Sequence, residues 1–467
     1  NKICTNRIKR FQFYFERLGI AMKFLNRSDK ELIILSWPIF IEFLFNVMVG
    51  NVNVWMISHF DEVAVAAVGA CNQFLGFSYN VYGFVTVGTQ IMIAQFLGAK
   101  KHKEIPKVMN TAIFGAIGIG LLLGAIFILL PYPLLRFLNI PDDVIAIAIP
   151  YMQLYGTGTI ILALNSVMLA CLRTHGLTLQ ALIVPTIANI LAVCGNYLVL
   201  FSPFGLPNFG VRGIAISGIF GQFCAGIVAI YLVKRYVKFN VLKVNFKRFS
   251  IPFLKQILKL GLPSSGESVS YSGAQVVVTM IVATLGTNVL ITKSYVSAIT
   301  QFVFLTASAL CQGNQIVIGR TVGAKDFEGA YQRGFRSMVQ NVGISTSISI
   351  VTFIFITPIM HIYTNKPEII ELARWVFLVE IILEAARAVN MTLVGSLNAS
   401  GDVRFPLACS LTVLWLISLP FSYLLAIVFH MGLVGVWIAY AIDESLRAML
   451  MIYRWHHGTW RTKSLFV

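Results

Sequence analysis

Charge is scarce in this sequence, because only 12% of its 467 residues are Asp, Glu, Lys or Arg, whereas 57% are hydrophobic. The mean hydropathy is +0.79, and a water-soluble protein of this length does not need so much apolar surface. Uncharged runs of about 20 residues recur along the chain, which is the length of a transmembrane helix. Lipid leaves no partner for backbone polar groups, so segments of this kind span it as helices. The sequence therefore predicts an all-α polytopic membrane protein.

Several signatures of catalysis and metal binding are missing as well. The seven cysteines include no CxxC pair and no metal-ligand spacing, so we expect neither a metal site nor a cofactor. No HExxH motif or nucleophile–base cluster is present, which argues against a membrane-embedded enzyme, and without a Walker A motif we expect no ATP-driven transport by this chain alone. Residues 1–21 are rich in Arg and lack the apolar core and cleavage site of a signal peptide.

The hydrophobic runs predict twelve spans. We expect them at roughly 32–57, 63–95, 108–130, 144–171, 179–201, 211–235, 255–284, 288–319, 332–357, 367–396, 404–428 and 433–455. The corresponding division of the chain is an N-terminal tail 1–30, an N-lobe 31–233, a basic linker 234–254, a C-lobe 255–456 and a C-terminal tail 457–467.

The net charge of +17 could suggest nucleic acid, but the positions of the charges favour a membrane instead. Most Lys and Arg residues lie in the two tails and in every second loop, whereas the alternate loops carry acids and turn formers. This is the positive-inside pattern, and it predicts a multi-pass protein of the plasma (cytoplasmic) membrane with both termini in the cytoplasm. We expect a lipid bilayer as partner and no nucleic acid.

A shift of 225 residues aligns the chain with itself. The segment "GTQIMIAQFLGAK" (88–100) falls on "GNQIVIGRTVGAK" (313–325), and seven of the thirteen positions are identical. The same register pairs Pro38 with Pro263 and Glu42 with Glu267. Because each half has six predicted spans, the halves insert with the same orientation and are related by an axis along the membrane normal. Parallel repeats of this kind place the substrate path between two lobes, near the bilayer midplane.

Acidic residues inside the spans are the candidates for a function, because a central charge costs about 2.5–3.5 kcal/mol and normally faces an interior or a wet cavity. Glu42 shares a helical face with Asn46 and Asn53 and has no basic residue near it in its span, so we expect it to hold a proton. Glu267 lies in a segment rich in Ser and Gly, which leaves room for water. For both glutamates the alternative is a structural hydrogen bond between packed helices.

The tenth and twelfth spans carry the other buried charges. Glu380, Glu384 and Arg387 share one helical face, and Arg387 can neutralise Glu384 at i,i+3, which leaves Glu380 as surplus negative charge. A structural pair and a functional network both remain open there. The last span has Asp443, Glu444 and Arg447, which we interpret as an ion pair that orients helices.

These patterns define the predicted site. The cation-coupling residues are predicted to be Glu267, Glu42, Glu380 and Glu384, and Na+, if it is the coupling ion, is expected near Glu267 and Glu380. The substrate-binding residues are predicted to be Asn46, Asn53, Gln73, Tyr271, Gln275, Gln301, Arg387 and Asn390.

Three segments together resemble bacterial MATE (multidrug and toxic compound extrusion) transporters, and the resemblance covers about residues 31–460. They are "AAVGACNQF" at the start of the second span, "AQFLGAK" with its repeat "GRTVGAK", and "SLNASGDVRFP" after the tenth span. The resemblance implies a V-shaped pair of lobes and export of organic, often cationic, compounds driven by inward H+ or Na+. We expect a monomer that works as an antiporter by alternating access.

Two positions depart from the family pattern. Asn53 stands where many members have an aspartate, and Arg387 stands where some members have one. An arginine there would repel bound Na+ unless Glu380 and Glu384 screen it. A rival interpretation is a flippase for lipid-linked precursors from the wider superfamily. Such a protein favours a cavity rich in Arg and Lys, whereas here only Arg387 and Arg447 are available.

Overall fold

The computed structural model describes residues 27–60, 62–138, 140–201 and 209–466, and every regular element in these ranges is a helix. Most of the predicted N-terminal tail therefore lies outside the described residues. The long helices of the first lobe are α2 (Arg27–Ser58), α3 (Glu62–Gly98), α4 (Ile105–Leu129), α6 (Asp142–Thr174), α7 (Thr178–Phe201) and α8 (Gly210–Leu232), with α5 (Pro131–Phe137) as a short helix after α4. The predicted linker 234–254 contains the short helical turns η2 (Val233–Val237), η3 (Val241–Lys243) and η4 (Phe246–Arg248), and its last residues already belong to the first helix of the second lobe.

The second lobe repeats this order. Its helices are α9 (Ile251–Ala283), α10 (Thr287–Gly323), α11 (Phe327–Ile354), the short α12 (Ile356–His361), α13 (Pro367–Ser400), a composite span and α16 (Gly432–His457). The composite span runs through α14 (Arg404–Val413), η5 (Leu414–Ser418), α15 (Leu419–Tyr423) and η6 (Leu424–Val428), and η7 (Thr459–Lys463) follows α16. The predicted all-helical, two-lobed architecture is confirmed, and every predicted span falls largely within one of these helical segments.

Nine helices in the described part of the chain are long and apolar enough to cross a membrane. All six long helices of the N-lobe are among them, but α9, α13 and α16 of the C-lobe are not. Serines interrupt the apolar run of α9, and charged residues interrupt those of α13 and α16. The long helices that are not apolar enough to be spans by composition therefore belong to the same lobe within the described residues.

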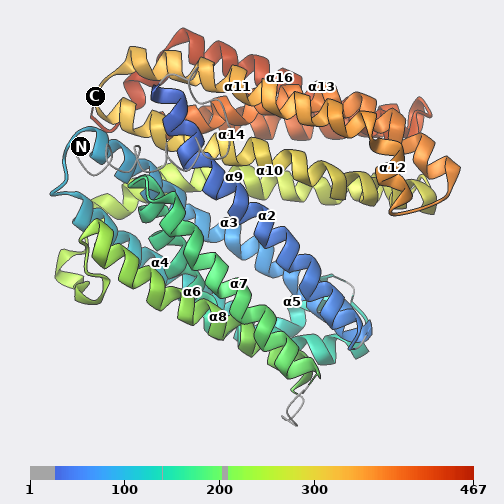
Figure 1. The fold of residues 1–467 in the computed structure, drawn as a ribbon, viewed down its shortest axis with the longest axis horizontal. Helices are drawn as coiled ribbons and strands as arrows, with labels where there is room; N and C mark the ends of the chain where they lie inside the picture. Colours follow the sequence, from blue (N-terminus) through green and yellow to red (C-terminus); the bar gives the residue numbers. More distant parts are fainter. Residues whose placement is uncertain (1–26, 61, 139, 202–208, 467) are drawn as a thin grey trace, which may run out of the picture.

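The two lobes converge at one end and separate at the other (Figure 1). The described C-terminal residues and the linker lie at the convergent end, whereas α5 and α12 lie at the opposite, open end. At the convergent end a Cβ on Gly98 would lie 1.9 Å from the carbonyl oxygen of Arg320, and one on Gly323 would lie 2.1 Å from that of Gln95. The ends of α3 and α10 thus touch backbone to backbone, which only glycine permits, and this explains why the motif repeats its glycine.

The first helix of each lobe also packs against the other lobe. A Cβ on Gly88 of α3 would lie 2.0 Å from the carbonyl oxygen of Ile257 in α9. In the corresponding contact, a Cβ on Gly313 of α10 would lie 2.1 Å from Ser36 Oγ in α2. Figure 1 shows α2 running from the C-lobe at the convergent end to the N-lobe at the open end. The lobes are therefore interlocked through α2 and α9.

An ion pair fixes the start of α2 against the C-lobe. The carboxylate of Asp29 is buried and accepts a hydrogen bond from Arg333 Nη1 of α11 at 2.8 Å. Arg336, one turn further along α11, binds the second carboxylate oxygen. The convergent end is thus joined by charge as well as by close backbone packing.

Candidate functional site

A cavity of about 410 Å³ lies in the wall of the C-lobe. It is bordered mainly by α9, α10, α13, α14 and α16, and Val87 of α3 also lines it. Four of its lining residues are charged: Glu267, Arg387, Glu444 and Arg447. This volume lies in the range of small-molecule sites, and a few convergent polar groups are what such sites contain.

Glu267 is the carboxylate of this cavity that lacks a basic partner. Its Oε1 accepts a hydrogen bond of 2.6 Å from Ser410 Oγ, and its side chain is half-buried. None of the ion pairs formed within the described ranges involves Glu267. The Ser-rich surroundings of Glu267 lie at this cavity, because Ser264 and Ser268 also line it. That water fills this space stays a prediction.

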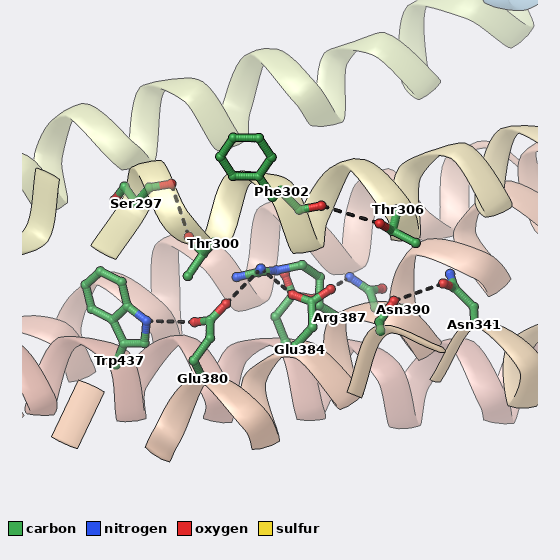
Figure 2. Close-up of polar contacts among 12 residues, drawn as sticks. Ser297, Thr300, Phe302, Thr306, Asn341, Glu380, Glu384, Arg387, Asn390 and Trp437 are labelled. Carbon is green, nitrogen blue, oxygen red and sulfur yellow. Dashed lines mark hydrogen bonds and ion pairs between the residues drawn. The ribbon is translucent and has the colours of Figure 1, made fainter. Parts of the chain in front are cut away.

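Arg387 joins two buried carboxylates of α13 (Figure 2). Its Nη1 lies 2.7 Å from Glu384 Oε2, which confirms the predicted i,i+3 pair, and 3.4 Å from Glu380 Oε1. Glu380, predicted to be the surplus carboxylate, is the more distant partner of Arg387, and it also accepts a hydrogen bond from the indole N–H of Trp437 at 2.7 Å. One arginine still faces two carboxylates, so this group carries one surplus negative charge.

On α16, one arginine again contacts two carboxylates. Arg447 binds both Asp443 and Glu444, and its distance to Glu444 Oε1 is 2.9 Å. Asn390 Nδ2 donates to Glu444 Oε2 at 2.8 Å. Because Glu444 and Arg447 line the cavity, this cluster is part of the site as well as a contact between helices.

Unpaired acceptor oxygens add to the negative character of the cavity. Asn390 Oδ1 and Asn398 Oδ1 are buried, and no hydrogen-bond partner for either lies in the described part of the chain. Both residues line the cavity. Buried acceptors need donors or a cation, so the lining favours a positively charged or proton-donating ligand.

The cavity unites only part of the predicted substrate set. Tyr271, Arg387 and Asn390 line it. Gln275 accepts a hydrogen bond of 2.9 Å from the Tyr440 hydroxyl and lies outside this lining. Gln73 and Gln301 are exposed and also lie outside it.

Glu42 has no basic residue near it in its own span, as expected, but the inference that it therefore lacks a cation is wrong. Arg173 Nη2 lies 2.5 Å from Glu42 Oε1, and both side chains are largely buried. The sequence placed Arg173 in a loop, but α6 continues to Thr174 and carries the arginine against α2. Arg173 Nη1 also donates to Gln312 Oε1 of α10 at 3.3 Å, so the pair extends across the boundary between the lobes.

The polar stripe of α2 faces α7. Asn189 Nδ2 donates to Asn46 Oδ1 at 2.6 Å, and Asn196 Nδ2 donates to Asn53 Oδ1 at 3.1 Å. Ser217 of α8 then donates to Asn196 at 2.9 Å. The Oδ1 atoms of Asn46 and Asn53 are thus engaged within the N-lobe, and their part in substrate binding stays a prediction.

The repeat relates these two environments position by position. The shift of 225 places Glu42 on Glu267, Arg173 on Asn398, and Val87 on Gln312. In the N-lobe an arginine occupies the place beside the glutamate. In the C-lobe the shorter Asn398 stands there, and a cavity lies beside Glu267. Sequence reasoning missed Arg173, Asn398 and Ser410, although the register of the repeat could have singled out the first two.

Comparisons with known proteins agree with this architecture. The "Uncharacterized transporter YisQ" of Bacillus subtilis is 35% identical over 94% of this chain and 97% of its own length. The "Probable multidrug resistance protein NorM" of Thermotoga maritima is 24% identical over 93% of this chain and 94% of its own length. A solved outward-facing MATE family transporter of the MOP superfamily shares the fold, with a TM-score of 0.85 at 19% identity, over 94% of this chain and 98% of that one.

The MatE family model matches residues 38–198 and again 263–424. The two matches begin at Pro38 and Pro263, the prolines that the repeat pairs. Together they cover more than half of the sequence, and they contain Glu42 and Glu267 at equivalent places. The chain therefore belongs to the MatE family of membrane transporters.

Proposed function

We propose that the protein is a secondary active antiporter that exports organic compounds, cationic or amphiphilic, in exchange for H+ or Na+ by alternating access. The observation that carries this proposal is Glu267, a carboxylate without a basic partner that faces a cavity whose lining residues include two asparagines with buried, unpaired acceptor oxygens. The names of the multidrug resistance relatives support the substrate class.

The charges around the cavity support a cationic ligand. Glu267, Glu380, Glu384, Asp443 and Glu444 supply five carboxylates, and Arg387 and Arg447 supply two positive charges. Buried charge must be balanced, so the surplus carboxylates bind protons, Na+ or a cationic substrate. A coupling ion and a cationic substrate then exclude one another from the same negative site, which is the requirement for exchange.

The coupling step is neutralisation of Glu267. A proton or Na+ that reaches Glu267 from outside removes its negative charge and weakens its attraction for a cationic substrate. Ser410 supplies a neutral oxygen beside it, and Asn398 lines the same cavity, so either ion has candidate hydrogen-bond or ligand partners there. One charge moving through 100 mV releases about 2.3 kcal/mol, which equals a roughly 50-fold concentration ratio.

We assign the convergent end to the cytoplasm of a plasma-membrane protein. The basic linker lies there, as the positive-inside rule requires of a cytoplasmic loop. In this orientation the structure is open to the outside, as is the solved transporter described as outward-facing. A cysteine at Asp142 should then react with an impermeant thiol reagent in intact cells, and one at Lys243 should not. Labelling at Lys243 alone would reverse the orientation.

The test of coupling compares the two equivalent glutamates. Glu267→Gln keeps the shape and removes the charge, so it should abolish substrate efflux driven by an imposed pH or Na+ gradient in proteoliposomes. Glu42→Gln should retain part of the activity, because Glu42 is paired with Arg173. Both variants are compared at equal amounts of folded protein, over pH 6 to 8. Normal efflux by Glu267→Gln, with loss in Glu42→Gln, would assign coupling to the N-lobe instead.

The flippase alternative finds less support in this geometry. Arg387 and Arg447 are both in contact with carboxylates, so neither offers an uncompensated charge to a pyrophosphate. Counterflow of a lipid-linked pyrophosphate in the same proteoliposomes, without counterflow of organic cations, would favour it.

A further inference from the structure

The segment Thr459–Phe466, here called the strap, follows α16 at the convergent end (Figure 1). Its first part is fixed to the C-lobe. The ring of Trp460 stacks on that of Trp455 with centroids 4.2 Å apart, and both side chains are fully buried. Trp460 Nε1 also donates to the carbonyl oxygen of Trp455 at 2.9 Å. This end of the strap is therefore an integral part of the C-lobe core.

The middle of the strap lies tightly on the turn between α13 and α14. Gly401 occupies that turn with a φ of +97°, and a Cβ there would lie 2.5 Å from the carbonyl oxygen of Lys463. Only glycine combines this backbone conformation with so close an approach. The turn "SLNASGDVRFP" thus provides the surface on which the strap leaves the C-lobe.

The last part of the strap contacts the N-lobe. The backbone N–H of Leu465 donates to Gln95 Oε1 of α3 at 3.0 Å. The Phe466 ring meets Phe96 edge to face with centroids 5.3 Å apart, and Lys101 Nζ lies 4.4 Å from the centroid of Phe466. Eight residues therefore connect the core of the C-lobe to the end of α3 in the N-lobe.

Gln95 is the point where strap and lobes meet. Its side chain is fully buried, and its Nε2 donates to the carbonyl oxygen of Ala399 in α13 at 2.7 Å. The same amide thus binds the C-lobe through its nitrogen and the strap through its oxygen. Both bonds require α3 and α13 to be adjacent, so they form only while the convergent end is closed.

We propose that the strap is a latch that stabilises the closed state of the convergent end and must release α3 before the lobes separate there. The contacts between the strap and the N-lobe exist in the closed state of the convergent end and not in the open state. They therefore favour the closed state by their full interaction free energy, as a ligand does that binds only one of two conformations. The aromatic pair and the hydrogen bond together are worth on the order of a tenfold change in the equilibrium constant. This inference rests on the alternating access proposed above, but not on the coupling ion or the substrate.

The test measures the separation of the lobes directly. Spin labels at Lys103, beyond the end of α3, and at Gln332 of α11 occupy exposed positions on different lobes at this end. Removing residues 464–467 should increase the population with the longer label distance about tenfold, and Phe466→Ala should give a smaller increase. Lys463→Ala is the matched control, because this exposed side chain belongs to the strap before its N-lobe contacts, and it should leave the distances unchanged.

Pulsed electron–electron resonance in nanodiscs and thermal unfolding of the same variants separate a latch from a purely structural tail. A latch predicts redistributed distances with an unfolding temperature close to that of the parent chain. A lower unfolding temperature with unchanged distances would overturn the proposal, as would an equal redistribution in Lys463→Ala. Because the readout is a distance, a failed latch is distinguishable from a failed transport mechanism.

Discussion

The N-lobe and the C-lobe share a topology and a sequence repeat, but their equivalent glutamates, Glu42 and Glu267, have opposite surroundings. In the N-lobe, Arg173 neutralises Glu42, and paired amides fill the polar seam between α2 and α7. In the C-lobe, Asn398 replaces the arginine, Glu267 has Ser410 as its partner, and a cavity remains beside it. Because the backbone plan is the same, the difference lies in a few side chains.

The distribution of polarity among the helices reflects the same contrast. All six long N-lobe helices are apolar enough to be spans by composition alone, whereas α9, α13 and α16, which line the cavity, are not. Charged residues in a span cost insertion energy and persist where they serve a wet interior. In the part of the chain that the structure describes, the helices too polar to be spans by composition therefore lie in the C-lobe, where they border the cavity.

The largest effect is expected when the C-lobe is given the arginine of the N-lobe. In Asn398→Arg the guanidinium can enter the cavity and pair with Glu267 as Arg173 pairs with Glu42. A neighbouring arginine lowers the affinity of a carboxylate for protons about 10- to 1000-fold, so gradient-driven efflux should be lost in proteoliposomes. Asn398→Gln is the control, because glutamine lengthens the side chain without adding a charge, and this variant should keep most of the activity. Full transport by Asn398→Arg would mean that Glu267 does not need to be free of a cation.

The second comparison concerns stability and tests how each lobe balances its charges. Arg173→Ala strands one carboxylate, and a buried charge left unpaired costs about 3–5 kcal/mol. Adding Glu42→Gln should restore most of that loss. Arg387→Ala strands two carboxylates, so adding Glu384→Gln should restore only part, because Glu380 remains. The unfolding temperatures of the purified variants provide the measurement. An equal recovery of stability in both lobes would contradict the assignment of one carboxylate to Arg173 and two carboxylates to Arg387.

The smallest effect is expected in the pH dependence of stability, at the turn that follows the fourth span of each lobe. His175, which the repeat places on Ser400, lies just after α6 outside the span, and burial lowers its pKa from 6.5 to about 4. The unfolded chain therefore binds a proton between pH 6.5 and 4 that the folded chain does not. Stability should be complete above pH 6.5 and fall by about 1–3 kcal/mol as the pH drops towards 4. His175→Gln should flatten this part of the unfolding profile, and an unchanged slope would show that other groups produce it.

The parts of the structure that sequence reasoning predicted are those that depend on local spacing. Glu384 and Arg387 lie three residues apart on a helix, and that spacing alone brings their side chains together. The spans and the repeat follow from hydropathy and identity along the chain. Arg173 and Glu42 are 131 residues apart, and their contact depends on how α6 packs against α2 and on one extra turn of helix that places Arg173 inside the lobe. Helix boundaries are the least certain part of such predictions, and here the boundary decided whether a glutamate was paired.

The contact of Asp29 with Arg333 also limits when the start of α2 can reach its final contacts during synthesis of the chain. The two residues are 304 positions apart, and a ribosome adding 5–20 residues per second needs about 15–60 s to cover that distance. During this interval α2 is present without the helix that neutralises its first turn, so the carboxylate stays hydrated at the membrane surface. The first turn of α2 consequently forms its ion pair only after α11 of the other half has emerged.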